Sequence, residues 1–227
     1  MASPRRTRSR VIAIVSSILM VGALTGLIAA MASAPSAPIR PTAAPVRSPD
    51  PSVSLSHPFT LGHAFPFTSR VDTLNGHPTT LARGSRGTVV IAMASWCLYC
   101  GYEDKWVLPV LAHMSGVTID VVDVSPRGGI ADPGPQTPPF SGHDGSGGPL
   151  TTAGMESVMQ QYMKAFGTLS APSIHVYVAP ASTRQAWQVT MFPTLAFINH
   201  AGRVAVAPPG AQTLPQAQAD LQQALHS

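Results

Sequence analysis

Two cysteines, three residues apart and directly after an apolar run, constrain this chain more than any other feature. The run, residues 88–93 (TVVIAM), is short and rich in β-branched residues, as expected of a buried central strand. Cys97 and Cys100 open residues 97–114, which predict a helix, and residues 117–124 (VTIDVVDV) predict a second strand. The order strand, helix, strand predicts a βαβ unit with two parallel strands.

The spacing of the cysteines favours redox chemistry over a structural disulfide. A bridge across two residues closes a small loop and removes little entropy from the unfolded chain, so it stabilises weakly. At a helix start, Cys97 would face free N–H groups and the positive end of the helix dipole, which stabilise its thiolate. Cys100, one turn further on, could resolve a mixed disulfide. A purely structural bridge is the alternative.

Metal or other cofactor binding is not expected from these residues. The chain has no second cysteine pair, and its eight histidines are scattered. Gly101, where a haem-attachment motif requires histidine, excludes a c-type haem at this site.

The N-terminal quarter of the chain predicts a membrane anchor followed by a spacer. Residues 1–10 carry four arginines and read as a basic cytoplasmic tail, and residues 11–31 are uncharged. A helix of that length, at ~1.5 Å per residue, would span a ~30 Å hydrocarbon core as a transmembrane signal-anchor. The alternative is a signal peptide cleaved near Ala34. Residues 32–56 are proline-rich and predict an extended linker.

Both interpretations place residues 57–227 outside the cytoplasmic membrane. From residue 57 onward the chain has eight Lys and Arg against nine Asp and Glu, so the positive net charge belongs to the N-terminal segment. No basic stripe is present, and nucleic acid is therefore not an expected partner.

The rest of the chain predicts short strands and helices around the βαβ unit. Asn75-Gly76 lies between strand-like residues and predicts a hairpin. Residues 125–150 form a Gly/Pro-rich insertion, which at this length is either functional or mobile. The remaining predictions are helices at 155–166 and 214–225, and strands at 174–178, 194–199 and 204–206.

Three segments together resemble one protein family across nearly all of residues 57–227. They are DTLNGHPTTL at 72–81, RGTVVIAMASWCLYC at 86–100 and AWQVTMFPTLAFINHAGRV at 186–204. In this order they are similar to the membrane-anchored TlpA/ResA branch of the thioredoxin superfamily. The resemblance implies a thioredoxin-like α/β fold, a central mixed sheet flanked by helices, with an N-terminal β-hairpin extension.

The resemblance also implies roles for particular residues. Cys97, preceded by Trp96, would attack, and Cys100 would resolve, the two forming a redox-active disulfide. Pro193 would be the cis-proline beside that disulfide. On either side of Pro193, Phe192 would offer backbone to a bound partner chain and Thr194 would complete the family's Pro-Thr pair. An ordinary proline at a strand start is the alternative for this last segment.

Glu103 would occupy the position of a buried acid that relays protons to the cysteines. Its alternative is a solvated glutamate favoured by the helix dipole. Two departures from the family stand out. Ile91 replaces the buried aspartate of cytoplasmic thioredoxins, and Leu98-Tyr99 matches no familiar reductase dipeptide. Because that dipeptide helps to set the reduction potential, the direction of electron flow stays open.

Three functions follow as hypotheses. The first is a thiol–disulfide oxidoreductase that takes electrons from a membrane redox partner and reduces cysteine-containing exported proteins, apocytochrome c among them. The second is an oxidase or isomerase that forms or reshuffles disulfides. The third is a non-catalytic binding or chaperone module with a thioredoxin-like surface.

Overall fold

The computed structural model describes residues 57–139 and 141–227. The predicted cytoplasmic tail (1–10), transmembrane helix (11–31) and linker (32–56) lie outside the described residues. In the part of the chain that is described, no helix has the length and apolarity needed to cross a membrane.

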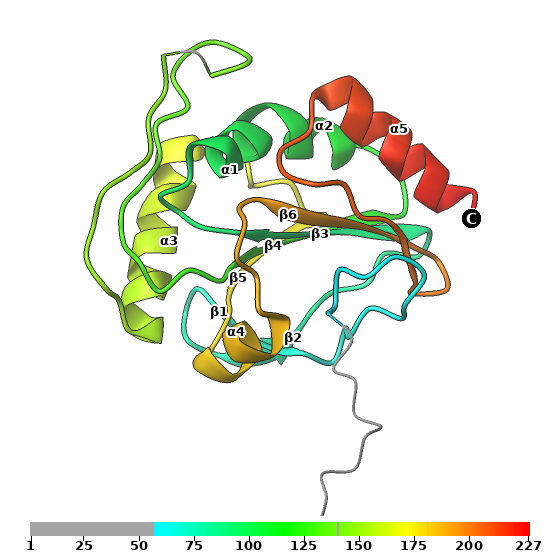
Figure 1. Ribbon diagram of the computed structural model, residues 1–227, viewed down its shortest axis with the longest axis horizontal. Coiled ribbons are helices and arrows are strands. Elements are labelled where there is room, and N and C mark those ends of the chain that lie inside the picture. Colours follow the sequence, from blue (N-terminus) through cyan, green and yellow to red (C-terminus); the bar gives the residue numbers. More distant parts are fainter. Residues whose placement is uncertain (1–56, 140) are drawn as a thin grey trace, which may run out of the picture. The chain divides into compact units, whose positions relative to one another are not determined.

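Within the described residues, seven strands form one mixed sheet in the order β2-β1-β5-β4-β3-β6-β7 (Figure 1). The strands are β1 (Arg70–Thr73), β2 (Pro78–Thr80), β3 (Gly87–Met93), β4 (Val117–Asp123), β5 (Ile174–Val178), β6 (Thr194–Asn199) and β7 (Val204–Val206). The helices are α1 (Leu98–Tyr102), the π-helical turn η1 (Glu103–Val107), α2 (Leu108–Leu111), α3 (Thr152–Phe166), α4 (Ala181–Trp187) and α5 (Leu214–Leu225).

The centre of the sheet is built from the run that precedes the cysteines. All seven residues of β3 are buried, because its two faces are both covered and its side chains are apolar or small. β3 pairs in parallel with β4 and antiparallel with β6. The predicted βαβ unit is therefore confirmed. The cysteine motif follows the end of β3, which is an inner strand of the sheet.

The predicted hairpin is formed by β1 and β2, which pair antiparallel. Its turn holds Gly76 at a φ of 76°, a left-handed conformation that glycine adopts without steric cost. β1 also pairs antiparallel with β5, so the hairpin extends the sheet at one edge.

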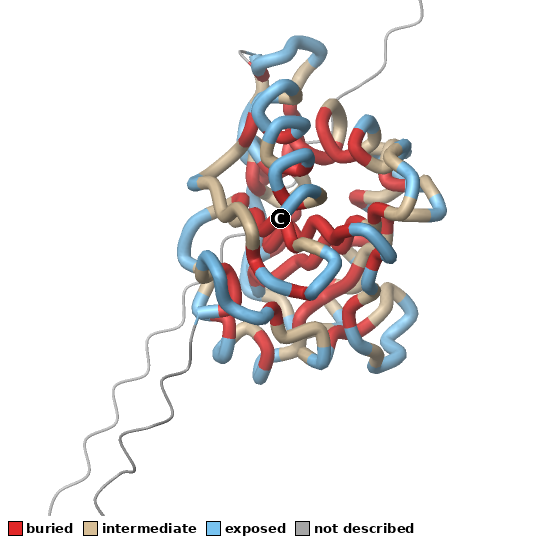
Figure 2. The backbone as a smooth tube through the Cα atoms, turned by 90° about the vertical axis from the view of Figure 1, so that its right-hand side faces the viewer, coloured by how far each residue is buried: buried red, intermediate tan, exposed pale blue. Residues whose placement is uncertain are grey.

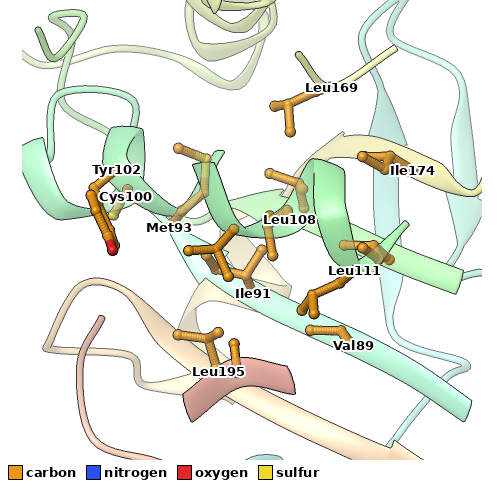
Figure 3. Close-up of a cluster of buried hydrophobic side chains, with 14 of the residues drawn as sticks. Val89, Ile91, Met93, Cys100, Tyr102, Leu108, Leu111, Leu169, Ile174 and Leu195 are labelled. Atoms are coloured by element: carbon orange, nitrogen blue, oxygen red, sulfur yellow. The ribbon is translucent and has the colours of Figure 1, made fainter. Parts of the chain in front are cut away.

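Helices cover both faces of the sheet. α1, α2 and α5 lie over one face, and α4 lies on the opposite side (Figure 1). Buried residues are concentrated in the strands at the centre of the domain and in the parts of the helices that pack against them (Figure 2). The larger apolar cluster, between β3 and the helices of the first face, includes Cys100 together with Ile91, Leu108 and Leu195 (Figure 3).

The helix predicted over residues 97–114 is broken into three pieces and ends at Leu111, and Pro109 lies in the third piece. Proline has no N–H, and its ring clashes with the carbonyl four residues earlier in a regular α-helix. Just before Pro109 the chain widens into η1, where the amide of Leu108 donates to the carbonyl oxygen of Glu103, five residues back. This π-helical turn lets the helix continue past the proline.

Candidate active site

Cys97 stands at the N-cap of α1, four residues after β3 ends at Met93. Its backbone is extended, with φ −79° and ψ 119°, and its Sγ accepts the amide of Cys100 at 3.2 Å. Its own amide donates to the carbonyl oxygen of Ala94 at 3.0 Å. The predicted placement at a helix start is therefore confirmed, and the sulfur takes the position that a capping oxygen occupies in other helices.

The two cysteines differ in exposure and acidity. Both are free thiols, with Cys97 5% exposed and Cys100 0%, so only Cys97 offers any surface to a partner. Hydrogen bonds from the side chain and amide of Cys100 lower the pKa of Cys97 below its ordinary value, although burial opposes them. Burial, followed by the interaction with Cys97, raises the pKa of Cys100 well above its ordinary value. Cys97 is therefore the more easily ionised thiol of the pair, and Cys100 is the thiol that keeps its proton.

Trp96 connects the motif to two other segments. Its ring meets the ring of Phe192 edge to face, with centroids 5.8 Å apart. Its Nε1 donates to Ser125 Oγ at 2.9 Å, and the guanidinium of Arg127 lies 4.9 Å from the ring centre. The half-buried indole thus packs between the segment before β6 and the start of the 125–150 insertion.

Pro193 is buried just before β6, and the Phe192–Pro193 peptide bond is cis, the geometry that the resemblance implies. Thr194 pairs with Ala92 near the end of β3, so this proline segment lies on the strand next to the motif. The Thr194 hydroxyl donates to the carbonyl oxygen of Met191 at 2.7 Å and closes the turn before β6.

Glu103 is fully buried, so its interpretation as a solvated residue of the first helical turn is wrong. Its Oε1 accepts the amide of Gln212, which precedes α5, and Oε2 has no hydrogen-bond partner among the described residues. Burial raises the pKa of Glu103 to about 8, against the effect of that hydrogen bond. A carboxyl group in this environment exchanges its proton near neutral pH.

Asp104 is a second buried acid, which the sequence analysis did not single out. It is fully buried, its Oδ2 accepts the hydroxyl of Tyr162 in α3 at 2.5 Å, and burial raises its pKa to about 7. Its charge adds to the rise in the pKa of Cys100. The signal that could have found it is its place four residues after Cys100, on the same side of a helix.

The 125–150 insertion packs against the motif. Two isolated bridges, Arg127 with Pro149 and Asp132 with His143, hold its two arms together. The amides of Ala131 and Gly145 donate to the carbonyl oxygens of Ser95 and Trp96 at 2.9 and 2.8 Å, which attaches both arms to the residues before Cys97. Asp144 Oδ1 accepts the amide of Leu98, the first residue of α1, at 2.8 Å.

A metal site requires ligating side chains that are grouped closely together. Among the described residues, no three His, Cys, Asp or Glu side chains are grouped so that they could hold a metal ion.

The sheet order, the cysteine motif at the end of a central strand and the proline segment beside it define a thioredoxin-like domain. The sequence matches no protein-family model and no curated protein. Among solved structures, it is similar to an Aquifex aeolicus VF5 protein assigned to electron transport, with 10% identity, a TM-score of 0.51 and coverage of 74% of this chain and 100% of that chain.

Two further solved structures share the likeness at lower scores. A thio-disulfide isomerase from Thermus thermophilus has 19% identity and a TM-score of 0.48, covering 73% of this chain and 96% of that one. A thioredoxin-like protein from Aeropyrum pernix has 13% identity and a TM-score of 0.45, covering 67% and 87%. At these identities the likeness concerns the fold.

The buried carboxyl groups predict that the folded protein is more stable at pH 5 than at pH 8. Burial raises the pKa of Glu103 and Asp120 to about 8, and of Asp104 and Asp123 to about 7, whereas unfolded carboxyls titrate near about 4. The folded state thus binds these protons more tightly. Their contribution to stability is complete below about pH 4 and is lost as pH rises through about 7 to 8.

Thermal melting at the two pH values tests this prediction, with a Tm expected to be about 5–10 °C lower at pH 8. Asp120→Asn, in a fully buried site, should reduce the pH dependence, whereas Asp132→Asn on the exposed insertion should leave it unchanged. A Tm that rises from pH 5 to pH 8 contradicts the prediction.

Proposed function

We propose that the protein is a thiol–disulfide oxidoreductase that reduces disulfides of cysteine-containing exported proteins outside the cytoplasmic membrane. The observation that carries the proposal is the hydrogen bond from the Cys100 amide to Cys97 Sγ at the start of α1, together with the lowered pKa of Cys97. A thiolate stabilised in this way, beside a buried second thiol, is the arrangement that disulfide exchange requires.

The reaction proceeds in two exchanges. The Cys97 thiolate attacks one sulfur of a substrate disulfide, so that a new S–S bond forms and the other substrate sulfur leaves as a thiolate. Cys100 then loses its proton and attacks the Cys97 sulfur, which forms the Cys97–Cys100 disulfide and releases the second substrate thiol. The motif loses two electrons and the substrate gains two. A dithiol donor, proposed to be a membrane redox partner, supplies two electrons to restore the pair.

The second exchange needs a group that accepts the proton of Cys100. Glu103 and Asp104 follow Cys100 within about one helical turn, both are fully buried, and their pKa values are raised to about 8 and about 7. We assign them the role of holding and releasing that proton, since both change protonation near neutral pH.

Phe192, Pro193 and Thr194 are proposed to hold the substrate chain beside Cys97. Phe192 packs on Trp96, the residue before Cys97, and β6 starts beside the end of β3. These two contacts support a place for the segment beside the attacking sulfur. Backbone groups there would bind an extended peptide without regard to its sequence, as β-strand addition does elsewhere.

The location and anchoring are proposed from the sequence. Residues 11–31 would hold the protein in the cytoplasmic membrane with the cysteine motif outside, where exported proteins acquire disulfides. Apocytochrome c, whose cysteines must be reduced before haem attachment, is one substrate that fits this location.

Two measurements test the proposal: the equilibrium reduction potential of the Cys97–Cys100 pair, and the turnover of the protein in an insulin-reduction assay. We expect a potential between about −300 and −250 mV and turnover of insulin in the presence of a dithiol donor. A potential near about −120 mV would identify an oxidase. Correct folding without turnover in reduction or refolding assays would favour a non-catalytic binding module.

A further inference from the structure

The 125–150 insertion brings a carboxylate to the start of the motif helix. The insertion leaves the end of β4, runs beside α1 and returns to α3 (Figure 1). Three hydrogen bonds join it to the backbone between Ser95 and Leu98, and one of the three uses the Asp144 side chain, whose Oδ1 accepts the Leu98 amide at 2.8 Å.

Glycines fix the position of this carboxylate. A Cβ on Gly145 would lie 2.5 Å from backbone atoms of Ile130, and one on Gly147 would lie 2.4 Å from the backbone of Gly128. Only residues without a side chain allow the two arms to approach this closely. The packed arms therefore hold Asp144 against the helix start.

The Leu98 amide is one of the N–H groups in the first turn of α1 that have no acceptor within the helix. Such groups, with the positive end of the dipole, stabilise a thiolate at the N-cap. Cys97 Sγ receives the amide of Cys100, but the amide of Leu98 is directed to Asp144. A negative charge at this place also repels the thiolate directly.

We propose that Asp144 is a positioning residue that weakens the Cys97 thiolate and thereby makes the dithiol a stronger reductant. The direction of this effect follows from the two forms of the pair, because a thiolate stabilises only the reduced form. A carboxylate that destabilises the thiolate destabilises the reduced form, and it therefore favours the loss of two electrons from the dithiol and formation of the disulfide. This redox consequence rests on the proposed function, whereas the effect on thiolate stability does not.

The charges around Cys97 agree with this role. The pKa of Cys97 is lowered chiefly by its hydrogen bonds with Cys100, and the charge of Asp144 acts in the opposite direction. Besides Asp144, the groups that act on the pKa of Cys97 are Cys100 and the amide of Tyr99, which lowers it. The pKa of Tyr162 in α3 is in turn raised by burial, by Asp104 and to a smaller extent by the charges of both cysteines.

The rate at which iodoacetamide alkylates Cys97 at pH 5.5, in the reduced full-length protein, tests the inference. Asp144→Asn keeps an oxygen for the Leu98 amide but removes the charge, and we expect at least about a threefold faster reaction. Asp144→Ala also frees the amide and should react at least as fast as the asparagine variant. Asp144→Glu restores the charge and should return the rate toward that of the unchanged protein.

Asp132→Asn is the matched control. Asp132 is an exposed aspartate of the same insertion, and its carboxylate accepts the amide of Gly134 rather than an amide of α1. Its rate should equal that of the unchanged protein. An unchanged or slower rate in Asp144→Asn, or the same acceleration in Asp132→Asn, would overturn the inference.

The alkylation assay separates this inference from the proposed function. If the unchanged protein fails to reduce insulin but Asp144→Asn still accelerates alkylation, the reductase proposal fails and the effect of Asp144 on the thiolate stands. If insulin is reduced and the alkylation rates are equal, the inference fails and the reductase proposal stands.

Discussion

Replacing Cys97 with serine is expected to lower the rate of disulfide reduction at least about 1,000-fold, because serine cannot form the thiolate that starts the exchange. Cys100→Ala should instead retain the first attack and accumulate mixed disulfides with substrate, since its resolving thiol is gone. The structure gives the reason for this asymmetry. Cys97 has the lowered pKa and the only exposed surface of the pair, and Cys100 is fully buried with a raised pKa.

Non-reducing electrophoresis of the two variants, exposed to an oxidised protein substrate, distinguishes the roles. A higher-mass band that dithiothreitol removes should appear for Cys100→Ala and be missing for Cys97→Ser and for the double variant. If the band forms through Cys100 in the Cys97→Ser variant, the assigned order of attack is reversed and the mechanism is wrong. Identifying the trapped proteins by mass spectrometry then names the substrates.

Trp187→Ala is expected to destabilise the fold by about 3–5 kcal/mol, the largest loss we predict from a single side chain away from the motif. Trp187 is 2% exposed at the end of α4, and its ring meets Phe59 and Phe65 edge to face at 5.6 and 6.0 Å. Its Nε1 donates to Ser69 Oγ at 3.2 Å. The alanine would leave a cavity between α4 and the segment that leads into β1.

Thermal or urea unfolding measures this loss, and the Tm should fall by about 10 °C. Trp187→Phe keeps most of the apolar contact but loses the hydrogen bond, so a loss of about 1–2 kcal/mol is expected. Leu61→Ala removes a side chain that is 64% exposed and should change stability by less than about 0.5 kcal/mol. A Trp187→Ala loss below about 1 kcal/mol would show that this packing is not as described.

The sheet could be predicted from the sequence because its strands have a local signature. The apolar, β-branched run of β3 and the similar run of β4 each predict a buried strand wherever they occur. The bounds predicted for β5, β6, β7 and α5 agree with the structure. Each of these elements is bordered by turn residues or, for α5, by a capping box at Thr213.

Other parts of the fold depend on contacts that a local pattern does not contain. α4 is seven residues long and mostly polar, and it is fixed by the burial of Trp187 and Thr183 at the sheet. The π-helical turn before Pro109 depends on how the chain accommodates a proline inside a packed helix. Neither feature produces a helical period long enough to recognise.

The site was predictable as far as the motif extends. Cys97, Cys100 and Trp96 follow from the motif itself, and the resemblance pointed to Pro193 and to an acid at Glu103. The hydrogen-bond partner of the buried Glu103 is the amide of Gln212, in the chain before α5 and 109 residues away in sequence.

Asp144 and Tyr162 could not be assigned from sequence because no spacing relates them to the cysteines. From the sequence, the Gly/Pro-rich insertion is either functional or mobile, whereas in the structure its glycines allow two arms to pack closely and direct a carboxylate to α1. Tyr162 reaches Asp104 only because α3 packs against the motif helix. Such contacts become visible once the fold places distant segments side by side.

The central claim, that Cys97 is the readily ionised thiol of the pair, is tested most directly by alkylating the reduced protein over a range of pH and assigning each cysteine by peptide mass spectrometry. The structure predicts that Cys97 reacts with a midpoint below the usual thiol pKa of about 8.5, while Cys100 stays unreactive at pH 9. A midpoint for Cys97 at or above about 8.5, or faster alkylation of Cys100 than of Cys97, would contradict it.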